Sequence, residues 1–202
     1  MIRILLITLL AINTLYALTA YEIATLSHDR DDGDNSVSKM KMILIDKAGH
    51  KRVRDLKTFG KDKGKDKLQL MFFLAPADVK ETAFLTFDYD DSNRDDDQWL
   101  YLPELKKVKR IASADKSAPF MGSDFSYSDM TSRNVDDYTH KIMKETTVGG
   151  HKVWQLLVTP KTEKTIMETG YTKSIVFIRQ DNYVTVQALN YVKKGKKLKY
   201  MK

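Results

Sequence analysis

Two Ser-x-x-Lys tetrads are the strongest candidates for nucleophilic chemistry in this sequence of 202 residues. Ser36 and Ser113 each precede a lysine by three positions, a spacing that lets the amine activate the hydroxyl at the start of a helix. However, Ser36 leads directly into an expected strand, and Ser113 lies in a turn-like stretch. The companion motifs Ser-Asp-Asn and Lys-Thr-Gly do not occur, and Ser123 lacks the glycine two positions earlier that a nucleophile elbow requires. We therefore expect that the protein is not an enzyme.

Potential metal ligands are present, but their spacing does not match a metal-binding motif. The sequence has no cysteine, and none of its 4 histidines forms an H-E-x-x-H pair. Residues 88–97 are rich in aspartate, whose oxygens suit calcium. If Asp91 opened an EF-hand loop, Asp96 would replace the required glycine and Leu102 the required glutamate. We expect a solvated hairpin loop here, with a weak calcium site as the alternative, and we predict no metal site and no cofactor.

The positive charge of the chain is concentrated in part at its C-terminal end. The formal net charge is +7, and the last ten residues contain Lys193, Lys194, Lys196, Lys197, Lys199 and Lys202. Such a tail can bind nucleic acid or an anionic membrane surface. Because no nucleic-acid-binding motif accompanies the lysines, we expect a solvated sheet edge and no nucleic-acid partner.

Short runs that alternate apolar with polar residues indicate antiparallel strands. Met40, Met42 and Leu44 share one face of the first, and residues 68–74 are apolar enough for a strand buried on both faces. Other strands are expected at residues 52–59, 83–89, 98–102, 107–112, 140–147, 152–159, 173–179, 183–192 and, after a turn at 193–196, at 198–201. A polar loop is expected at residues 60–67, and helices only near 21–26 and 126–132. The pattern predicts one large antiparallel sheet with few helices.

The N-terminal segment has the order of parts found in a secretory signal peptide. Arg3 precedes an apolar run at residues 4–12, and small residues follow at Ala17 and Ala20. The run is shorter than the about 20 apolar residues that span a bilayer, so an uncleaved anchor is the weaker alternative. We predict a signal peptide over residues 1–20, with cleavage after Ala17 or Ala20.

The middle third of the chain resembles a known family. The resemblance is carried, in order, by Phe72-Phe73-Leu74-Ala75-Pro76-Ala77-Asp78-Val79, Thr82-Ala83-Phe84-Leu85-Thr86, Asp95-Asp96-Asp97-Gln98-Trp99-Leu100-Tyr101-Leu102-Pro103, Arg110-Ile111 and Phe120-Met121-Gly122-Ser123-Asp124-Phe125-Ser126-Tyr127. In this order and spacing they resemble the outer-membrane lipoprotein-sorting proteins of the LolA-like superfamily. The likeness extends from about Tyr21 to the C-terminus.

The resemblance implies a mainly β (α+β) fold of the LolA/LolB type. In this fold a curved, open antiparallel half-barrel sheet has its concave face covered by a few short helices. Family members continue for several more strands than this chain contains. We therefore expect residues 21–202 to form a single lipid- or lipoprotein-binding domain that is C-terminally truncated and lacks its last strands.

The resemblance also implies a function and a location. Family members are periplasmic, which implies a periplasmic carrier or chaperone that binds lipid or lipoprotein acyl chains in an apolar cavity. The carrier would pass these chains between membranes, with an inner-membrane transporter of the resistance-nodulation-division (RND) type as partner. The alternative is a periplasmic sensor or accessory subunit that binds lipid or lipoprotein and regulates a membrane partner. We expect a monomer.

Aromatic residues of the expected strands are candidates for the wall of such a cavity, with ordinary core packing as the alternative. The ligand-binding residues that we predict are the strand aromatics Phe72, Phe84, Trp99 and Tyr101, and, in the loop at the mouth of the cavity, Phe120, Met121, Phe125 and Tyr127.

Overall fold

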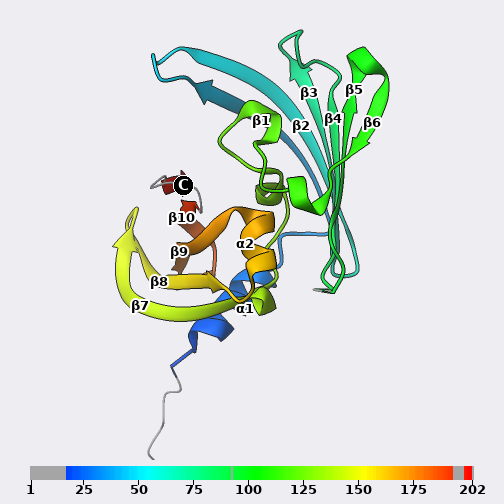
Figure 1. Ribbon diagram of the computed structural model, residues 1–202. Helices are drawn as coiled ribbons and strands as arrows, with labels where there is room; N and C mark the ends of the chain where they lie inside the picture. Colours follow the sequence, from blue (N-terminus) through cyan, green and yellow to red (C-terminus); the bar gives the residue numbers. More distant parts are fainter. Residues whose placement is uncertain (1–16, 92, 193–197, 202) are drawn as a thin grey trace, which may run out of the picture.

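The described part of the chain forms two antiparallel sheets with short helical segments between them (Figure 1). The computed structural model of the protein describes residues 17–91, 93–192 and 198–201. The predicted signal peptide up to residue 16 and the predicted turn at 193–196 lie outside the described residues. No helix in the described ranges is long and apolar enough to cross a membrane.

The first sheet is a six-stranded meander in which each strand pairs with its neighbour in sequence. Its strands are β1 (Asn35–Ile45), β2 (Lys51–Lys63), β3 (Asp66–Ala75), β4 (Ala83–Asp88), β5 (Asp97–Leu102) and β6 (Lys107–Arg110). The prediction of a polar loop at residues 60–67 was wrong, because β2 and β3 continue to a tight hairpin at Gly64, whose φ is 66°. Charged side chains there extend from paired strands into solvent, so their polarity did not indicate a loop.

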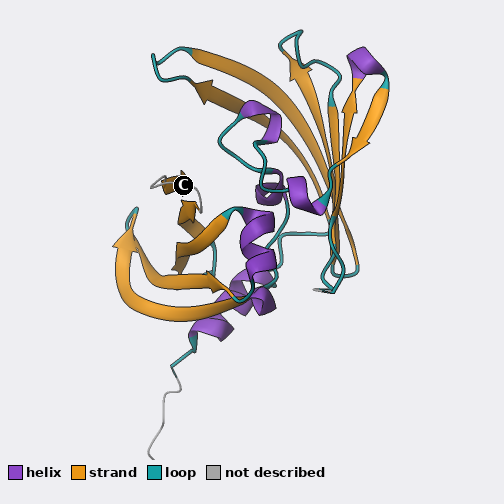
Figure 2. Ribbon diagram, in the orientation of Figure 1, coloured by secondary structure: helices purple, strands orange, loops and turns teal. Residues whose placement is uncertain are grey.

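The second sheet has five strands in the order β11-β10-β9-β8-β7. Its strands are β7 (Tyr138–Val148), β8 (His151–Pro160), β9 (Tyr171–Arg179), β10 (Thr185–Val192) and β11 (Leu198–Met201). Figure 2 shows how few helices accompany the strands: α1 (Ala20–His28), α2 (Glu163–Thr169) and the 3-10 helices η1 (Pro103–Leu105), η2 (Ser113–Asp115), η3 (Phe120–Gly122), η4 (Tyr127–Met130) and η5 (Val135–Asp137).

The mainly β, open and curved antiparallel class is confirmed, but the expectation of one continuous sheet was wrong. Residues 111–137 connect β6 to β7 through turns and 3-10 helices, so these two strands do not pair and the hydrogen bonding divides there. The expected helix near residues 21–26 is present as α1. The expected helix at 126–132 is only the 3-10 turn η4, and sequence patterns did not predict α2.

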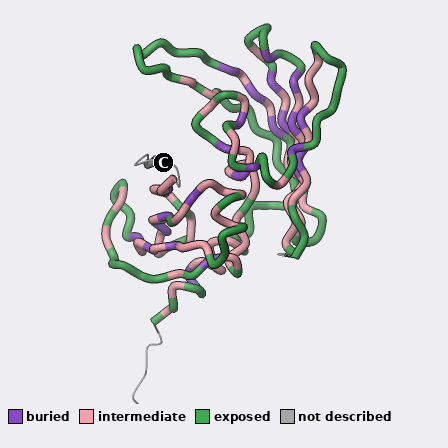
Figure 3. Tube along the Cα trace, in the orientation of Figure 1, coloured by how far each residue is buried: buried purple, intermediate pink, exposed green. Residues whose placement is uncertain are grey.

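The core of the six-stranded sheet lies on one face, which we call the inner face. This face carries Leu56, Met71, Phe73, Phe84 and Leu100, all of which are buried. Figure 3 shows buried stretches side by side on neighbouring strands of this sheet. Strand β3 was expected to be buried on both faces, which was wrong: Met71 and Phe73 are buried, but Leu74 is 44% exposed. The buried side chains of β3 therefore follow the period of two of a strand with one core face.

Helix α1 packs against the five-stranded sheet through Ile23, which is fully buried beside Leu156 and Ile178. The helix begins with a capping box, in which the Thr19 hydroxyl accepts from the Glu22 amide and the Glu22 carboxylate accepts from the Thr19 amide. Leu18 packs against the same apolar cluster. Residues just before the helix therefore contribute to its stability.

The core position of Phe120 and the surface position of Phe125 give a paired prediction. Phe120 is fully buried, whereas Phe125 is 41% exposed. Phe120→Ala should lower the free energy of unfolding by about 3–5 kcal/mol, because it leaves a cavity in the core. Phe125→Ala should change the free energy by less than about 0.5 kcal/mol. Urea unfolding followed by circular dichroism measures both; equal losses would contradict the placement of Phe120.

The cap of α1 favours one of the two predicted cleavage sites. Cleavage after Ala20 would remove Leu18 and Thr19, whereas cleavage after Ala17 keeps the capping box intact. We expect the exported protein to begin at Leu18, and a chain that begins at Tyr21 to be less stable by at least about 1 kcal/mol. Intact-mass analysis of exported protein and thermal unfolding of the two chains test this. An N-terminus at Tyr21 would contradict it.

Candidate functional site

The inner face of the six-stranded sheet is covered by the stretch that connects the two sheets. We call residues 111–134 the closing segment. Its Phe120 ring lies 5.0 Å from the Phe84 ring and 6.2 Å from the Phe73 ring, measured between centroids. Tyr127 packs beside them, 5.5 Å from Phe120. The closing segment thus supplies the second layer of an apolar cluster whose first layer is the sheet.

Hydrogen bonds hold the closing segment to the first sheet at both of its ends, but few reach its central residues 116–128. The amide of Ile111 donates to the Gln98 carbonyl at 2.9 Å, and the Gln98 side-chain amide donates to the Tyr127 carbonyl at 2.8 Å. Gln98 is fully buried, so these bonds are sheltered from water. Most other bonds of residues 116–128 are internal, such as the Phe120 amide to the Phe125 carbonyl at 2.7 Å. Residues 116–128 therefore form a loop with mostly internal backbone hydrogen bonds, and its apolar side chains pack on the inner face.

Arg54 on β2 makes the charged contact between the inner face and the closing segment. It is only 7% exposed, and its guanidinium donates to the Met121 carbonyl at 2.6 Å and lies 6.0 Å from the Phe73 ring centroid. Met121 has a φ of 49° and Gly122 a φ of 74°, so the accepting carbonyl lies in a left-handed turn. A non-glycine residue in that region costs about 1–3 kcal/mol, which the Arg54 bond and the Phe120 packing offset.

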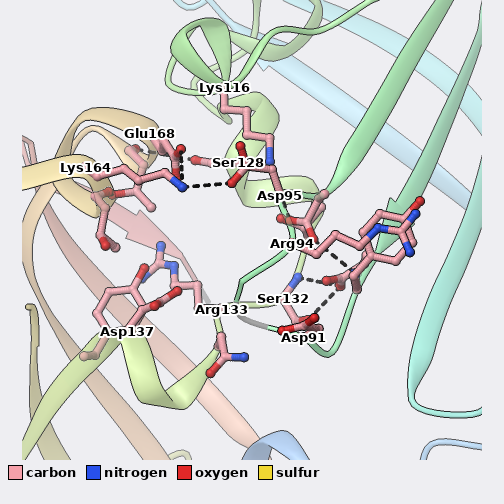
Figure 4. A pocket seen from close by; sticks show the side chains of 18 of the residues that line it. Asp91, Arg94, Asp95, Lys116, Ser128, Ser132, Arg133, Asp137, Lys164 and Glu168 are labelled. Carbon is pink, nitrogen blue, oxygen red and sulfur yellow. Dashed lines mark hydrogen bonds and ion pairs between the residues drawn. The ribbon is translucent and has the colours of Figure 1, made fainter. Parts of the chain in front are cut away.

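A cavity of about 270 Å³ lies where the acidic loop after β4, the closing segment, η5 and α2 meet (Figure 4). Its lining is charged. Lys164 on α2 donates to Asp95 at 2.9 Å and lies 3.8 Å from Glu168. Buried Lys116 lies 3.8 Å from Asp96. The Lys164–Asp95 pair connects the loop after β4 with α2, which lies between β8 and β9 in sequence.

The carboxyl groups of this cavity have pKa values shifted in both directions. The hydrogen bond from Lys164, with one from the Ser113 hydroxyl, lowers the pKa of Asp95. Burial raises the pKa of Asp96, and the neighbouring charge of Asp88 raises it further, against the opposing effect of Lys116. Burial also raises the pKa of Glu168, against Lys164. The carboxylates are thus engaged with cations of the same cavity.

This charged cavity has the chemistry of a polar contact between the sheets. Among the residues that the structure describes, no group of three or more histidine, aspartate or glutamate side chains is arranged to hold a metal ion. The aspartates of residues 88–97 point to protein partners: the Ser132 hydroxyl donates to Asp88 at 2.6 Å, and Arg110 pairs with Asp97. The expected solvated loop is in fact tethered to the second half of the chain.

The structure separates the eight predicted ligand-binding residues instead of bringing them into one cavity. Phe84, Phe120, Met121 and Tyr127 belong to or pack against the inner-face cluster. The remaining four do not. Phe125 is 41% exposed, and the outer face of the sheet carries Phe72, Trp99 and Tyr101.

The expectation that all eight share a cavity was therefore wrong. Adjacent residues of a strand point to opposite faces, so Phe72 cannot share a face with Phe73, nor Trp99 with Leu100. On the outer face, Trp99 and Tyr101 line a shallow apolar groove with Leu85, Phe87 and others.

Arg54 was not among the predicted site residues, although a signal for it was present. Strand β2 alternates, so Arg54 lies on the same face as Leu56 and Thr58, both of which are buried. A charged residue in phase with a buried face is unusual unless it has a partner. That partner, the Met121 carbonyl, is 67 positions away, and local periodicity does not reveal it.

Comparisons with known proteins agree with this architecture. A family model described only as "-like: Uncharacterized protein" matches residues 65–202. A domain from Vibrio parahaemolyticus, classed as outer membrane lipoprotein-sorting, is 35% identical; the match covers 87% of this chain and 73% of that one, with a TM-score of 0.78. No match was found among curated proteins.

Two further solved structures share the fold. A DUF1329 family protein from Desulfovibrio piger is 34% identical, covers 89% of this chain and 74% of its own, and has a TM-score of 0.79. A LolA superfamily protein from Nitrosomonas europaea is 17% identical with a TM-score of 0.62, over 90% of this chain and 75% of its own, which bears on the fold alone. The chain therefore belongs to the family of the outer-membrane lipoprotein-sorting domain and the DUF1329 protein, and it shares the fold of the LolA superfamily protein.

Proposed function

We propose that the protein is a periplasmic carrier that binds the acyl chains of lipids or lipoproteins on the inner face of its six-stranded sheet. The main support is the inner-face cluster, an apolar surface across several strands that is covered by a separate loop. A relative classed as lipoprotein-sorting supports the same class of ligand. An acyl chain would take the place of Phe120, Met121 and Tyr127 when the closing segment moves away.

The energetics of such an exchange are favourable in magnitude. Burial of each methylene contributes about 0.8 kcal/mol, so ~14 methylenes would contribute on the order of 11 kcal/mol before ordering costs. This gain in free energy is opposed by the loss of the Phe120 and Tyr127 contacts and of the Arg54 bond to the Met121 carbonyl. Both states bury the inner face, so binding replaces one apolar cover with another.

Arg54 would then set the balance between the empty and the loaded states. Its guanidinium bonds the closing segment only while that segment covers the sheet. A hydrogen bond to a charged group contributes about 1.5–3 kcal/mol, which corresponds to roughly a 10- to 100-fold change in an equilibrium constant. The bond therefore opposes loading and favours release.

Arg54→Met tests this role. The variant should bind a fluorescent fatty acid roughly 10-fold or more tightly than the unaltered protein, because opening no longer breaks a charged hydrogen bond. Fluorescence titration measures the dissociation constant. Arg52→Met is the matched control, since Arg52 precedes Arg54 by two positions on β2 but is exposed. If no saturable binding is seen in any of the three proteins, the carrier proposal fails. Equal affinities would remove only the role of Arg54.

Tight acyl binding makes spontaneous release slow, so a carrier needs a receiving partner. We infer that this partner is an inner-membrane transporter of the RND type. The protein would meet it in the periplasm, to which the predicted signal peptide directs the chain. Lipid-loaded protein should crosslink to such a transporter in native membranes more strongly than empty protein. Mass spectrometry of the crosslinked species identifies the partner. Equal crosslinking of both forms would instead indicate a sensor that stays with one partner.

A further inference from the structure

The outer face of the six-stranded sheet is apolar over β3 to β6, although no helix packs against it within the described residues. Figure 1 shows both helices and the closing segment on the opposite, inner side. The groove on this face has a volume of about 520 Å³ and is lined by Leu70, Ala83, Leu85, Phe87, Trp99, Tyr101 and Val108. A sheet whose second face is also apolar is typical of a surface that contacts something else.

The groove contains aromatic residues of the kind that is common at membrane interfaces. The rings of Phe87 and Trp99 lie 5.2 Å apart, edge to face, and Tyr101, two residues further along β5, lies opposite Val108 on the edge strand β6. At that edge Val108 is 64% exposed, and Leu105, in the turn before β6, is 61% exposed. Tryptophan and tyrosine are the side chains that collect at membrane interfaces, because each joins an apolar ring to a polar group.

The neighbouring part of the outer face is basic. The register of β1 with β2 places Lys39, Lys41, Lys57 and Lys61 on this face, beside Asp55. Asp55 pairs with Lys41 at 2.6 Å. No described carboxylate forms an ion pair with Lys39, Lys57 or Lys61, and the Lys57 ammonium lies 4.7 Å from the Phe59 ring centroid. An apolar strip thus lies beside an uncompensated positive strip.

We propose that this outer face docks on an anionic lipid bilayer. The lysines of β1 and β2 meet the charged headgroups, and the aromatic groove with Val108 enters the interface. Charge decides against a second copy of the chain as the occupant, because two such faces would bring like charges together. Docking here leaves the inner face and its closing segment on the side away from the membrane, so the surface is independent of the proposed acyl site.

Tryptophan fluorescence tests the proposal, because the chain has 2 tryptophans in different places. Trp99 lies in the groove, whereas Trp154 stacks on Tyr183 in the other sheet. Trp154→Phe therefore leaves Trp99 as the only reporter, and Trp99→Phe leaves Trp154. With vesicles of phosphatidylcholine and phosphatidylglycerol, brominated acyl chains should quench Trp99 and spare Trp154. Equal quenching of both, or none of either, overturns the proposal.

Reversing the charge of two lysines on the outer face is the second test of the docking proposal. Lys39→Glu/Lys61→Glu should weaken vesicle co-sedimentation by more than about tenfold, and added salt should weaken binding of the unaltered protein. Lys141→Glu/Lys144→Glu on β7 has the same change in net charge at exposed positions and should bind normally. Equal loss in both variants overturns the proposal, as does a stable dimer in solution that does not bind vesicles.

The carrier proposal and the docking proposal can be contradicted independently of each other. Fatty-acid binding should be the same in the Lys39→Glu/Lys61→Glu variant as in the unaltered protein, because neither side chain lies on the inner face. Loss of vesicle binding with intact fatty-acid binding supports the docking surface. Vesicle binding through Trp99 without any fatty-acid binding would retain the docking surface and remove the carrier.

Discussion

The contact between the closing segment and the inner face is the interaction on which most of the structure depends. Phe120 fills the space among Phe73, Phe84 and Tyr127, and no other element covers this part of the sheet within the described residues. Without that cover, the sheet would expose its buried apolar row to water. The same stretch of chain joins the two sheets, so its position also determines how they are arranged. One apolar contact therefore governs both stability and access to the candidate site.

The charged cavity complements this apolar contact. Lys164 of α2 pairs with Asp95 in the loop that follows β4, and Arg133 donates to the Ser174 hydroxyl of the five-stranded sheet at 3.1 Å. Partly exposed ion pairs contribute little energy each, but their geometry is specific. They hold the two sheets in a defined orientation. The polar contacts between the two sheets thus set their orientation, whereas the apolar contacts of the closing segment cover the inner face.

Local patterns predicted the strands well, because alternation reports directly on a half-buried strand. They failed where the outcome depended on partners far away in sequence. The division into two sheets follows from the path of residues 111–137, and the face of each aromatic follows from register. Trp99 and Leu100 are adjacent and both apolar, yet they occupy opposite faces. Trp99 was predicted to line the cavity but lies on the outer face, whereas Leu100, which was not among the predicted residues, lies on the inner face. The family resemblance supplied the fold class, but it did not supply this distinction.

The meander topology of both sheets has a consequence for how the chain acquires its structure. Every described strand pairs with a neighbour in sequence, and the longest connection between paired strands is residues 161–170, which contains α2. Loop-closure entropy is then small, and contact order is low for a protein made mostly of strands. The chain has no cysteine, so no disulfide guides its assembly. Hairpins can therefore form in the order in which they emerge, and the long-range docking of residues 111–134 is left as the step that completes the native state.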